Sequence, residues 1–598
     1  MSLPASERTR WALVVAVGAL LLAALNLWWV MRFREGYPFD IDEAGYTVFG
    51  LIDYFGLRDN GLEGWWSAIQ NQPTFAPLVP ALTSFLVYVD PGVMNGFMVL
   101  TAFLVVLTMA IYGIGAQLAG PRLGAFAALV TATMPGAFAF SREYVYALPT
   151  AALLACAIYA LIRSDGLRLR RWAIACGAAL GLMLLARTMA IVYVPGVLAA
   201  GLVVAFARGR GDLTNRFVNL ALVVATGVAT AATWYARNLQ SVIDYLTNYG
   251  YGSQSKYYGA DHSLVSVGRL RSVAERMTSE DLFFPLAVVL AIGLIAMTVV
   301  VVRSLLPRET RRTFLERLGA TDALSVAIVL LLGYAALMSS QNGGNGFTLP
   351  LAALLPTLAV LILRRFPAAL VPAVAATALI AAVNILSTAT IWSTASSTRM
   401  ISVPGFREEF PLTKGMPKAV FALRLQIPGP ETTFDDEDVQ WLEADREVLE
   451  LLAGLYGPHG EAPVVGFAAR NRALTTNSIQ LASVLKYQRG IPFVQLEAEP
   501  NDSVSTYTEQ LTDPETGIAS ALVTMSSTAG DFPPIVTQSY AETAARRLGF
   551  HRIDTMPLPD GRRLRLWVKR DEEPALVSCG SSRKAAEASD CRPGSPPG

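Results

Sequence analysis

Long apolar runs recur over the first two thirds of this 598-residue chain, and they restrict its fold more than any other feature. A helix needs roughly 20 apolar residues to cross a bilayer. Only 16% of the residues are charged, against about 25% in soluble domains. The sequence therefore predicts a polytopic α-helical membrane protein. Eleven segments are candidate spans, near 11–31, 93–116, 122–139, 146–162, 172–187, 189–207, 217–236, 283–302, 323–340, 348–363 and 367–392.

Arginines set the predicted orientation, because cytoplasmic loops of membrane proteins are enriched in Lys and Arg. With eleven spans and a cytoplasmic N-terminus, every arginine cluster falls on the cytoplasmic side. We therefore predict a multi-pass protein of the cytoplasmic membrane whose C-terminal part lies outside the cytoplasm. The clusters are Arg8 and Arg10; Arg163, Arg168, Arg170 and Arg171; Arg208, Arg210 and Arg216; Arg303, Arg308, Arg311, Arg312 and Arg317; and Arg364 and Arg365.

The same topology divides the chain into parts. Residues 1–392 form the predicted transmembrane domain, and its first outer loop spans residues 32–92. Residues 393–434 are a linker without expected regular structure. Residues 435–570 alternate between strand-like and helix-like segments, which predicts a small extracytoplasmic α/β domain. The Ser-, Gly- and Pro-rich residues 571–598 are predicted to be disordered.

The expected elements of the α/β domain follow from short apolar runs and helical periodicity. We expect strands at 464–467, 493–496, 521–524 and 563–568, and helices at 477–487 and 538–548. In the first outer loop, apolar positions from Ala44 to Phe55 recur at helical spacing, and Gly56 is expected to end that helix. A second interfacial element is expected around Pro77–Leu82.

Asp40, Asp42 and Glu43 form a carboxylate run directly after the first span, without a Lys or Arg among them. A charged group beside the hydrocarbon is costly unless water or a cation meets it. On the predicted topology this run faces outside the cytoplasm, at the start of the interfacial helix. The residues alone leave two roles open, a functional acidic site and a solvated helix cap.

Three arginines lie at the predicted outer ends of spans, against the positive-inside bias: Arg142, Arg187 and Arg237. Glu143 follows the first of them. Because guanidinium binds phosphate through two parallel hydrogen bonds, the set predicts an anionic ligand at the outer leaflet. Snorkelling of single arginines to the interface is the alternative.

The aromatic stretch from Tyr245 to His262 includes Tyr249 and Tyr257, which are candidates for binding a sugar. Ordinary interfacial tyrosines are the alternative. The glycine-rich run from Asn342 to Gly346 is expected to be a simple turn.

Several functional classes lack their sequence features. No Gly-x-x-x-x-Gly-Lys loop is present, which argues against an ATP-driven pump. The three histidines are too dispersed for a zinc site. There is no basic stripe, so no nucleic-acid partner is expected. No cleavable signal peptide is expected either.

The four cysteines give little functional information. Cys156 and Cys176 lie in apolar segments and are expected to be small core residues. Cys579 and Cys591 lie in the C-terminal tail, and their pairing stays open.

The run Asp42-Glu43-Ala44-Gly45-Tyr46 resembles the Asp-Glu-x-x-Tyr signature in the first outer loop of GT-C glycosyltransferases. The group it resembles holds the protein O-mannosyltransferases and the aminoarabinose transferases that modify lipid A, a glycosyltransferase family 39-like group. The resemblance covers roughly residues 11–350. Later landmarks follow in the same order at Ala76-Pro77-Leu78, Phe140 to Pro149, Gly181 to Thr188 and Trp234 to Asn238.

The resemblance implies an inverting enzyme that transfers a sugar from a polyprenyl-phosphate carrier to a hydroxyl acceptor outside the cytoplasm. It makes Asp42 the catalytic base. The other implied roles are acceptor or metal binding by Asp40, Glu43 and Glu143, donor-phosphate binding by Arg187, Arg237 and Arg142, and sugar or acceptor binding by Tyr46, Tyr249 and Tyr257.

The chain departs from the family pattern at two positions. Phe75-Ala76 stand where members often carry a lysine, and Tyr146 to Pro149 stand where a second acidic residue is common. Metal dependence therefore stays open, with Mg or Mn on Asp42 and Glu143 as the only cofactor in question. Two rival functions also stay open: a non-catalytic transporter or lipid-carrier flippase, and an envelope-assembly scaffold.

Overall fold

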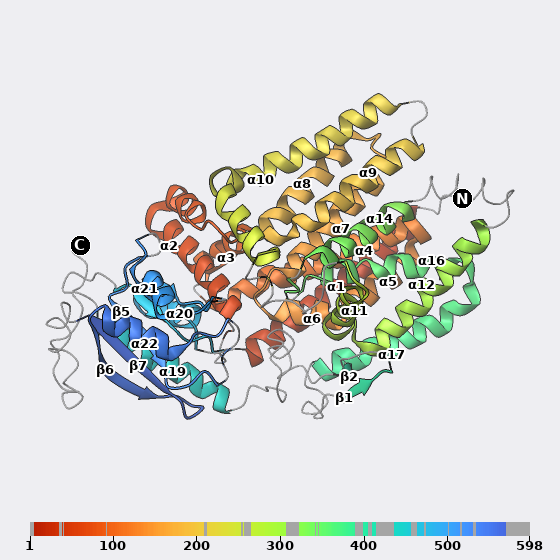
Figure 1. Cartoon of the computed structure of the whole chain (residues 1–598). Helices are drawn as coiled ribbons and strands as arrows, with labels where there is room; N and C mark the ends of the chain where they lie inside the picture. Colours follow the sequence, from red (N-terminus) through yellow and green to blue (C-terminus); the bar gives the residue numbers. More distant parts are fainter. Residues whose placement is uncertain are drawn as a thin grey trace. The chain divides into compact units, whose positions relative to one another are not determined.

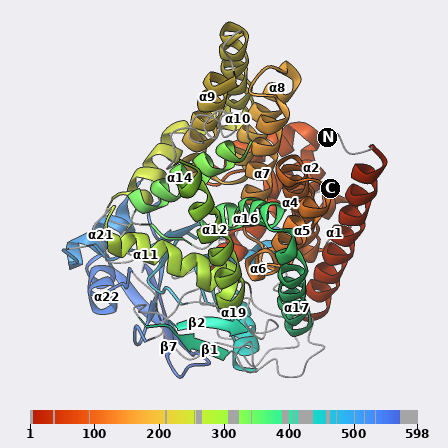
Figure 2. The same cartoon turned by 90° about the vertical axis from the view of Figure 1, so that its right-hand side faces the viewer.

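The computed structural model describes most of the chain (Figures 1 and 2). Its contacts divide the chain into two units, Met1–Glu35 with Phe49–Thr433, and Gly36–Val48 with Phe434–Gly598. Asp40, Tyr257, Cys579 and Cys591 lie outside the described residues, as do the tail 571–598 and most of the linker. The described residues are 5–34, 39, 41–90, 92–208, 212–252, 255, 265–305, 322–340, 342–344, 346–388, 399–404, 409–413, 436–455, 463–471, 474–499, 501–514, 517–529, 531 and 534–569.

The first unit is almost entirely helical. Its described elements, in chain order, are α1 Ala5–Phe33, α2 Ile41–Gln70 (whose first turns belong to the second unit), α3 Leu78–Val89, η1 Val93–Asn95, α4 Gly96–Ala119, α5 Pro121–Ala132, α6 Pro135–Arg142, α7 Ala147–Arg163, α8 Arg170–Ala186, η2 Thr188–Tyr193, α9 Val194–Arg208, α10 Leu213–Gly250, α11 Val267–Arg276, η4 Met277–Leu282, α12 Phe283–Leu305, α14 Ala323–Ser339, α15 Leu349–Ala352, α16 Leu355–Arg365, η5 Pro367–Ala369 and α17 Leu370–Thr388.

Within the described residues, six helical segments are long and apolar enough to cross a membrane, and α5 with α6, bent by 54°, forms a seventh candidate. Each predicted span falls on described helices, although several of those helices are shorter than a full span. The prediction of a mostly helical, multi-pass membrane protein is confirmed, whereas the count of eleven stays a prediction. The six segments are Glu7–Arg32, Val93–Ala119, Thr188–Ala207, Leu213–Gly250, Val267–Val299 and Pro367–Ile385.

Helix α4 lies in the middle of the helical unit, beside α1, α5 and α7 (Figure 2). Its apolar side chains Phe97, Leu100 and Leu104 are fully buried. A helix that is apolar on all sides fits the interior of a bundle or a lipid-facing surface, and the burial of these side chains places α4 in the interior. The bundle is therefore organised around α4, with α8 following beside α7.

Helices α8 and α10 lie side by side and cross at very short distance (Figure 1). A Cβ atom built on Gly181 would lie 2.5 Å from the Thr230 Cβ, and one on Gly177 would lie 2.3 Å from the Val223 carbonyl oxygen. These two glycines form a Gly-x-x-x-Gly motif, which lets helix backbones approach closely inside a bilayer. The crossing therefore depends on the absence of side chains on this face of α8.

Helix α2 departs from the expectation that Gly56 would end it. The helix continues to Gln70, and its kink lies at Asn60 and Gly61, where Gly61 adopts φ +62° and ψ −151°. Only glycine reaches that conformation readily. Gly56 remains helical, and the returning chain packs on it, because a Cβ there would lie 2.6 Å from the Gly64 carbonyl oxygen. Gly56 is thus a position of close backbone contact inside the helix and not the end of the helix.

Asp53, on α2, is a buried carboxyl group of the first outer loop. Its Oδ1 accepts a hydrogen bond of 2.8 Å from the Gln72 Nε2. Burial raises the pKa of Asp53 to about 8, and the hydrogen bond from Gln72 opposes that rise only in part. The folded protein therefore holds a proton on Asp53 at neutral pH.

The second unit contains a five-stranded sheet in the order β4-β3-β5-β7-β6. β3 runs parallel to β4 and β5, whereas β7 runs antiparallel to β5 and β6. The elements are α19 Asp436–Ala453, β3 Val465–Phe467, α20 Thr476–Tyr487, β4 Phe493–Gln495, α21 Val504–Thr512, β5 Ala521–Met525, α22 Gln538–Arg547, β6 Phe550–Pro557 and β7 Arg563–Lys569.

The four strands and two helices expected from the sequence are confirmed, while α19, α21 and β6 were not foreseen. The linker was expected to be irregular, but it contains the antiparallel pair β1 Arg399–Ser402 and β2 Glu409–Thr413. These strands are short and mixed in polarity, so they carry no clear alternation. The second unit also includes residues 36–48, which the predicted boundaries assign to the first outer loop.

Helices cover both faces of this sheet, because apolar side chains on its strands point alternately to one face and the other. On β5, Ala521 and Val523 pack in one buried cluster with α19 and α20, whereas Leu522 points into the cluster formed with α21 and α22. Successive side chains of a strand point to opposite faces. The unit is therefore a three-layer α/β structure with two apolar layers.

Gly181→Ala is expected to destabilise the protein, because the new methyl group collides with Thr230 and with the α10 backbone. Overpacking of this kind typically costs about 1–3 kcal/mol. The measurement is the thermal midpoint in detergent micelles. Gly18→Ala on α1 is the matched control, since a Cβ there meets nothing within 4 Å. Equal midpoints for the two variants would contradict the close crossing.

Asp53→Asn is expected to flatten the pH dependence of stability. The ordinary carboxyl pKa is 3.8 and that of folded Asp53 is about 8, so the stability of the wild type falls as pH rises through this window. The stability of the asparagine variant does not fall in this way, because the amide does not ionise. Its thermal midpoint at pH 8 should therefore be higher than that of the wild type. Thermal midpoints at pH 5 and pH 8 test the expectation. Asp59→Asn, at an exposed position of α2, should keep the wild-type dependence between these pH values.

Candidate functional site

Three stretches of the sequence that lie far apart meet in one buried cluster of the helical unit. Ile69 near the end of α2, Leu185 near the end of α8, and Trp234 and Val242 on α10 form this cluster, and Leu78 at the start of α3 packs against it. The stretches around residues 76–78, 181–188 and 234–238 are those singled out as landmarks in the sequence. The fold therefore brings them together around the ends of α8 and α2.

Arg237 lies beside the end of α2. Its Nη2 donates a hydrogen bond of 2.9 Å to the Asn71 Oδ1. One turn earlier on α10, the Trp234 Nε1 donates to the Ile69 carbonyl at 3.2 Å. The Gln70 Nε2 donates to the Thr233 carbonyl at 2.9 Å in the reverse direction. These bonds fix the middle of α10 to the C-terminal end of α2 and leave the Arg237 side chain at an exposed position.

Arg187 follows the last residue of α8 in an extended conformation with φ −157°. Its guanidinium carbon lies 4.1 Å from the centre of the Phe347 ring, a cation–π arrangement. The Tyr193 hydroxyl donates a short hydrogen bond to the Phe347 carbonyl. The half-buried Arg187 is therefore held against the loop that leads into α15.

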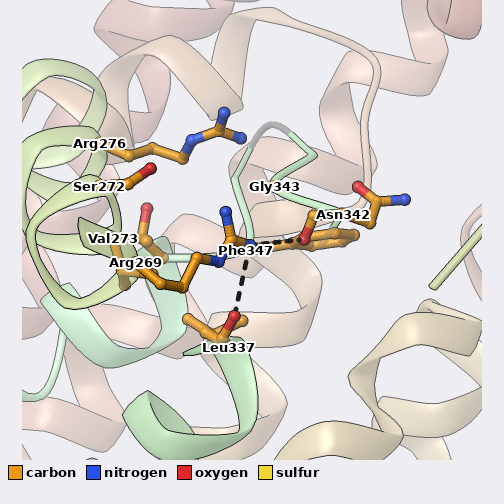
Figure 3. Close-up of a pocket in the computed structure, with 9 residues that line it drawn as sticks. Arg269, Ser272, Val273, Arg276, Leu337, Asn342, Gly343 and Phe347 are labelled. Atoms are coloured by element: carbon orange, nitrogen blue, oxygen red, sulfur yellow. Dashed lines mark hydrogen bonds between the residues drawn. The ribbon is translucent and has the colours of Figure 1, made fainter. Parts of the chain in front are cut away.

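A pocket lies next to Phe347, between α11 and the loop after α14 (Figure 3). Arg269 and Arg276 extend from α11 toward this loop. The buried Arg269 Nη2 donates to the Ser340 carbonyl at 2.6 Å and lies 3.4 Å from the carbonyls of Leu337 and Asn342. It therefore stabilises the loop through backbone carbonyl groups.

Arg276 lines the same pocket. It pairs with Glu280 at 3.6 Å, and a Cβ built on Gly343 would lie 2.8 Å from its guanidinium. Two guanidinium groups, those of Arg269 and Arg276, thus line the pocket, and Arg187 packs on the Phe347 ring, which lines it too.

Arg269 and Arg276 were not recognised from the sequence, and the run from Asn342 to Gly346 was taken for a simple turn. A usable signal was present, because the two arginines are seven residues apart, which places them on one face of a helix. The segment that carries the two arginines comes directly before the predicted span 283–302, at the end of that span that is predicted to lie outside the cytoplasm. The loop after α14 forms the other wall of the pocket, and only the folded structure shows that it lies against α11.

Tyr249 contributes to the same region through its backbone and its ring. The Asn342 Nδ2 donates a hydrogen bond of 2.9 Å to the Tyr249 carbonyl, so the end of α10 is tied to the pocket loop. The Tyr249 ring lies 4.9 Å from that of Tyr245, which in turn lies 6.3 Å from the Phe75 ring. An aromatic row thus runs from the pocket loop toward the stretch before α3.

Arg142 lies in a different environment. It is fully buried, its Nε donates to the Asn26 Oδ1 at 2.5 Å, and its guanidinium carbon lies 4.3 Å from the centre of the Trp29 ring. The neighbouring Glu143 is also buried. These contacts join α6 to α1. The predicted role of Arg142 in binding phosphate stays a prediction, and the pocket residues named above do not include it.

Asp42, Glu43 and Tyr46 lie in the first turns of α2, within the second unit. Asp42 is exposed, whereas Glu43 is 1% exposed. The Thr47 Oγ1 donates a hydrogen bond of 2.7 Å to the Glu43 carbonyl. The exposed Asp42 is therefore the carboxylate of this turn that faces solvent.

The described residues contain no group of three or more His, Cys, Asp and Glu side chains that could hold a metal ion. Asp40, the first carboxylate of the run, lies outside them. Asp42 belongs to the second unit and Glu143 to the first, so Mg or Mn on these two residues stays an expectation, and we derive no step through a metal.

Comparison with known proteins shows what one segment and the overall fold are similar to. Residues 72–235 match the family described as dolichyl-phosphate-mannose-protein mannosyltransferase, a segment that contains most of the landmark stretches. A comparison with curated protein sequences gives no match.

Among solved structures, the chain is similar to ArnT from Cupriavidus metallidurans bound to undecaprenyl phosphate, with a TM-score of 0.53 and 13% identity over 93% of this chain and 98% of that one. The apo state of that protein gives a TM-score of 0.52 and 14% identity over the same shares. The chain thus shares the overall fold of ArnT, and its segment 72–235 is similar to the protein mannosyltransferase family.

Proposed function

We propose that the protein is an inverting glycosyltransferase that moves a sugar from a polyprenyl-phosphate carrier to a hydroxyl group on a protein, lipid or cell-envelope glycan. The observation that carries the proposal is the set of arginines at one pocket: Arg269 and Arg276 line it, and Arg187 packs on the Phe347 ring, which lines it too. Guanidinium groups bind phosphate with matching geometry. The similar fold of ArnT, which binds undecaprenyl phosphate in its crystal structure, supports a lipid-linked phosphate as the ligand.

The proposed reaction takes place on the outer face of the cytoplasmic membrane. In this proposal the helical unit crosses the membrane eleven times, its N-terminus is cytoplasmic, and the α/β unit lies outside the cytoplasm. The distribution of arginines among the loops supports this orientation. Multi-pass insertion itself is supported by the six long apolar helices.

In the proposed mechanism, the acceptor oxygen attacks the anomeric carbon of the sugar while Asp42 accepts the hydroxyl proton. The bond between the anomeric carbon and the phosphate oxygen breaks, and the phosphate leaves with the electron pair. Attack opposite the leaving group inverts the configuration. The phosphate is already a good leaving group, so it needs charge stabilisation more than a strong acid.

The arginines would supply that stabilisation. Arg276 is the strongest candidate for direct contact, because it lines the pocket. Arg187 would act from its place on the Phe347 ring, while Arg269 would hold the loop. Arg237 and Arg142 remain proposed phosphate ligands on the family resemblance. Tyr46 and Tyr249 remain candidates for contact with the sugar or acceptor, as do Asp40, Glu43, Glu143 and Tyr257.

Asp42→Asn is expected to abolish transfer, because the amide is nearly isosteric but accepts no proton. Membranes containing either protein are supplied with radiolabelled polyprenyl-phosphate sugars, mannose first, and labelled acceptor is measured. General-base catalysis typically contributes about 10²–10⁴-fold, so a loss of that size is expected at equal protein level. Wild-type transfer by the variant would remove Asp42 from the mechanism and favour a scaffold or transporter role for the carboxylate run.

Arg276→Gln is expected to raise KM for the lipid-linked donor by roughly 10–100-fold, since a hydrogen bond to a charged group contributes about 1.5–3 kcal/mol. It should also weaken inhibition by unlabelled undecaprenyl phosphate. Arg271→Gln is the matched control, because Arg271 lies on the same helix, pairs with Glu275 at 2.7 Å and does not line the pocket. If the two variants change KM equally, the pocket is not the phosphate site.

A further inference from the structure

The first turn of α2 is bound by a side chain that lies more than 430 residues further along the chain. The Asn477 Nδ2 donates a hydrogen bond of 2.7 Å to the Ile41 carbonyl oxygen. Both residues belong to the second unit. Ile41 directly precedes Asp42, so the bond holds the peptide group that carries the proposed base.

Gly45 makes this approach possible. A Cβ built on Gly45 would lie 2.8 Å from the Asn477 Nδ2 and 3.2 Å from its Cγ. In an α-helix the carbonyl of residue 41 also accepts from the amide of residue 45, and a carbonyl oxygen has two lone pairs for two donors. The carboxamide of Asn477 therefore lies over the glycine and reaches a carbonyl that an alanine at this position would obstruct.

Asn477 is itself held firmly at the start of α20. Thr475 caps this helix through a reciprocal pair of hydrogen bonds with Ser478, of 3.0 Å and 2.9 Å. The Ser478 hydroxyl also donates to the buried Asp445 Oδ1 on α19 at 3.0 Å. Such a capping box fixes the backbone of the first helical turn. The Asn477 donor thus starts from a backbone with little freedom.

The helix behind it is packed against the sheet. Ile479 of α20 is fully buried in the cluster that contains Val448 and Leu452 of α19 and Val465 of β3. Close-packed interiors of this kind transmit small displacements instead of absorbing them. A displacement of α20 would therefore reach the Asn477 carboxamide.

We propose that Asn477 is a positioning residue for the transfer reaction, which fixes the first turn of α2 and with it the direction in which Asp42 presents its carboxylate. The inference rests on the proposed function, in which Asp42 is the base. It assigns the α/β unit a task in the reaction that differs from acceptor binding. Misplacement of a reacting group by about 1 Å can lower a rate by about 10²-fold.

The test uses the full-length protein and two independent readouts. Asn477→Ala should raise hydrogen exchange of the backbone amides of residues 43–48, because their turn loses its anchor. It should also lower kcat for transfer from the radiolabelled polyprenyl-phosphate sugar roughly 10–100-fold, with KM for the donor unchanged. Gln480→Ala on the same helix is the matched control, since it removes a carboxamide that does not donate to Ile41 and should change neither readout.

A double-mutant cycle with Gly45→Ala tests the contact itself. In the wild type, the added methyl group should displace Asn477 and lower kcat. In Asn477→Ala the same methyl group has no carboxamide to meet, so its further effect should be small. Thermal midpoints of the variants verify that the α/β unit stays folded, and additive effects of the two substitutions would contradict the contact.

The outcomes separate this inference from the function on which it rests. If Asp42→Asn abolishes transfer while Asn477→Ala keeps wild-type kcat, Asn477 is not a positioning residue and the function stands. The same conclusion follows if exchange rises in residues 43–48 but kcat does not fall. If Asp42→Asn keeps full transfer, the base assignment fails and the positioning role fails with it, whatever the exchange data show.

Discussion

The close crossing of α8 and α10 is the contact on which the candidate site depends. Gly177 and Gly181 let the two backbones meet, and both helices then run on to site residues. Arg187 follows the end of α8, while α10 carries Arg237 and, further along, Tyr249. Since lipid tails are as apolar as the side chains of the helices, the packing cannot draw on the hydrophobic effect and depends on fit. A looser crossing would change the spacing of Arg187, which follows α8, and Arg237 on α10, both of which are proposed ligands of the donor phosphate.

The surroundings of each arginine decide which of them is suited to bind an anion. A charge in apolar surroundings is stable only when it is paired or hydrogen-bonded. Arg142 is surrounded by Asn26 and the Trp29 ring, and Arg269 donates to backbone carbonyls, so these two side chains already have structural tasks. Arg276 lines the pocket beside Gly343 and pairs with Glu280. A guanidinium at a pocket wall can meet an anion with matching geometry, so Arg276 is better placed for such a ligand than the fully buried Arg142.

The sequence was sufficient for features whose cause is local. Apolar runs of span length gave the helices, and short β-branched runs such as Val464 to Phe467 gave the strands. It was insufficient where a residue acts through a distant partner. Gly56 looked like a helix end because its contact with Gly64 forms only after the chain turns at Gly61. Arg276 and Gly343 are separated by more than sixty residues, and the seven-residue spacing of Arg269 and Arg276 gives no sign of the loop that meets them. The link between Asn477 and Ile41 spans most of the chain and has no periodicity at all.

Helix α2 connects these observations, because its two ends are anchored by different parts of the chain. Its last turn is bonded to α10 through Trp234 and Gln70, within the helical unit. Its first turn is bonded to Asn477, within the α/β unit. The kink at Gly61 lies between these two anchors. A displacement of one end of the helix therefore need not be transmitted in full to the other end. A base placed on the first turn is thus positioned mainly by the α/β unit, whereas the arginines that would bind the phosphate belong to the helical unit.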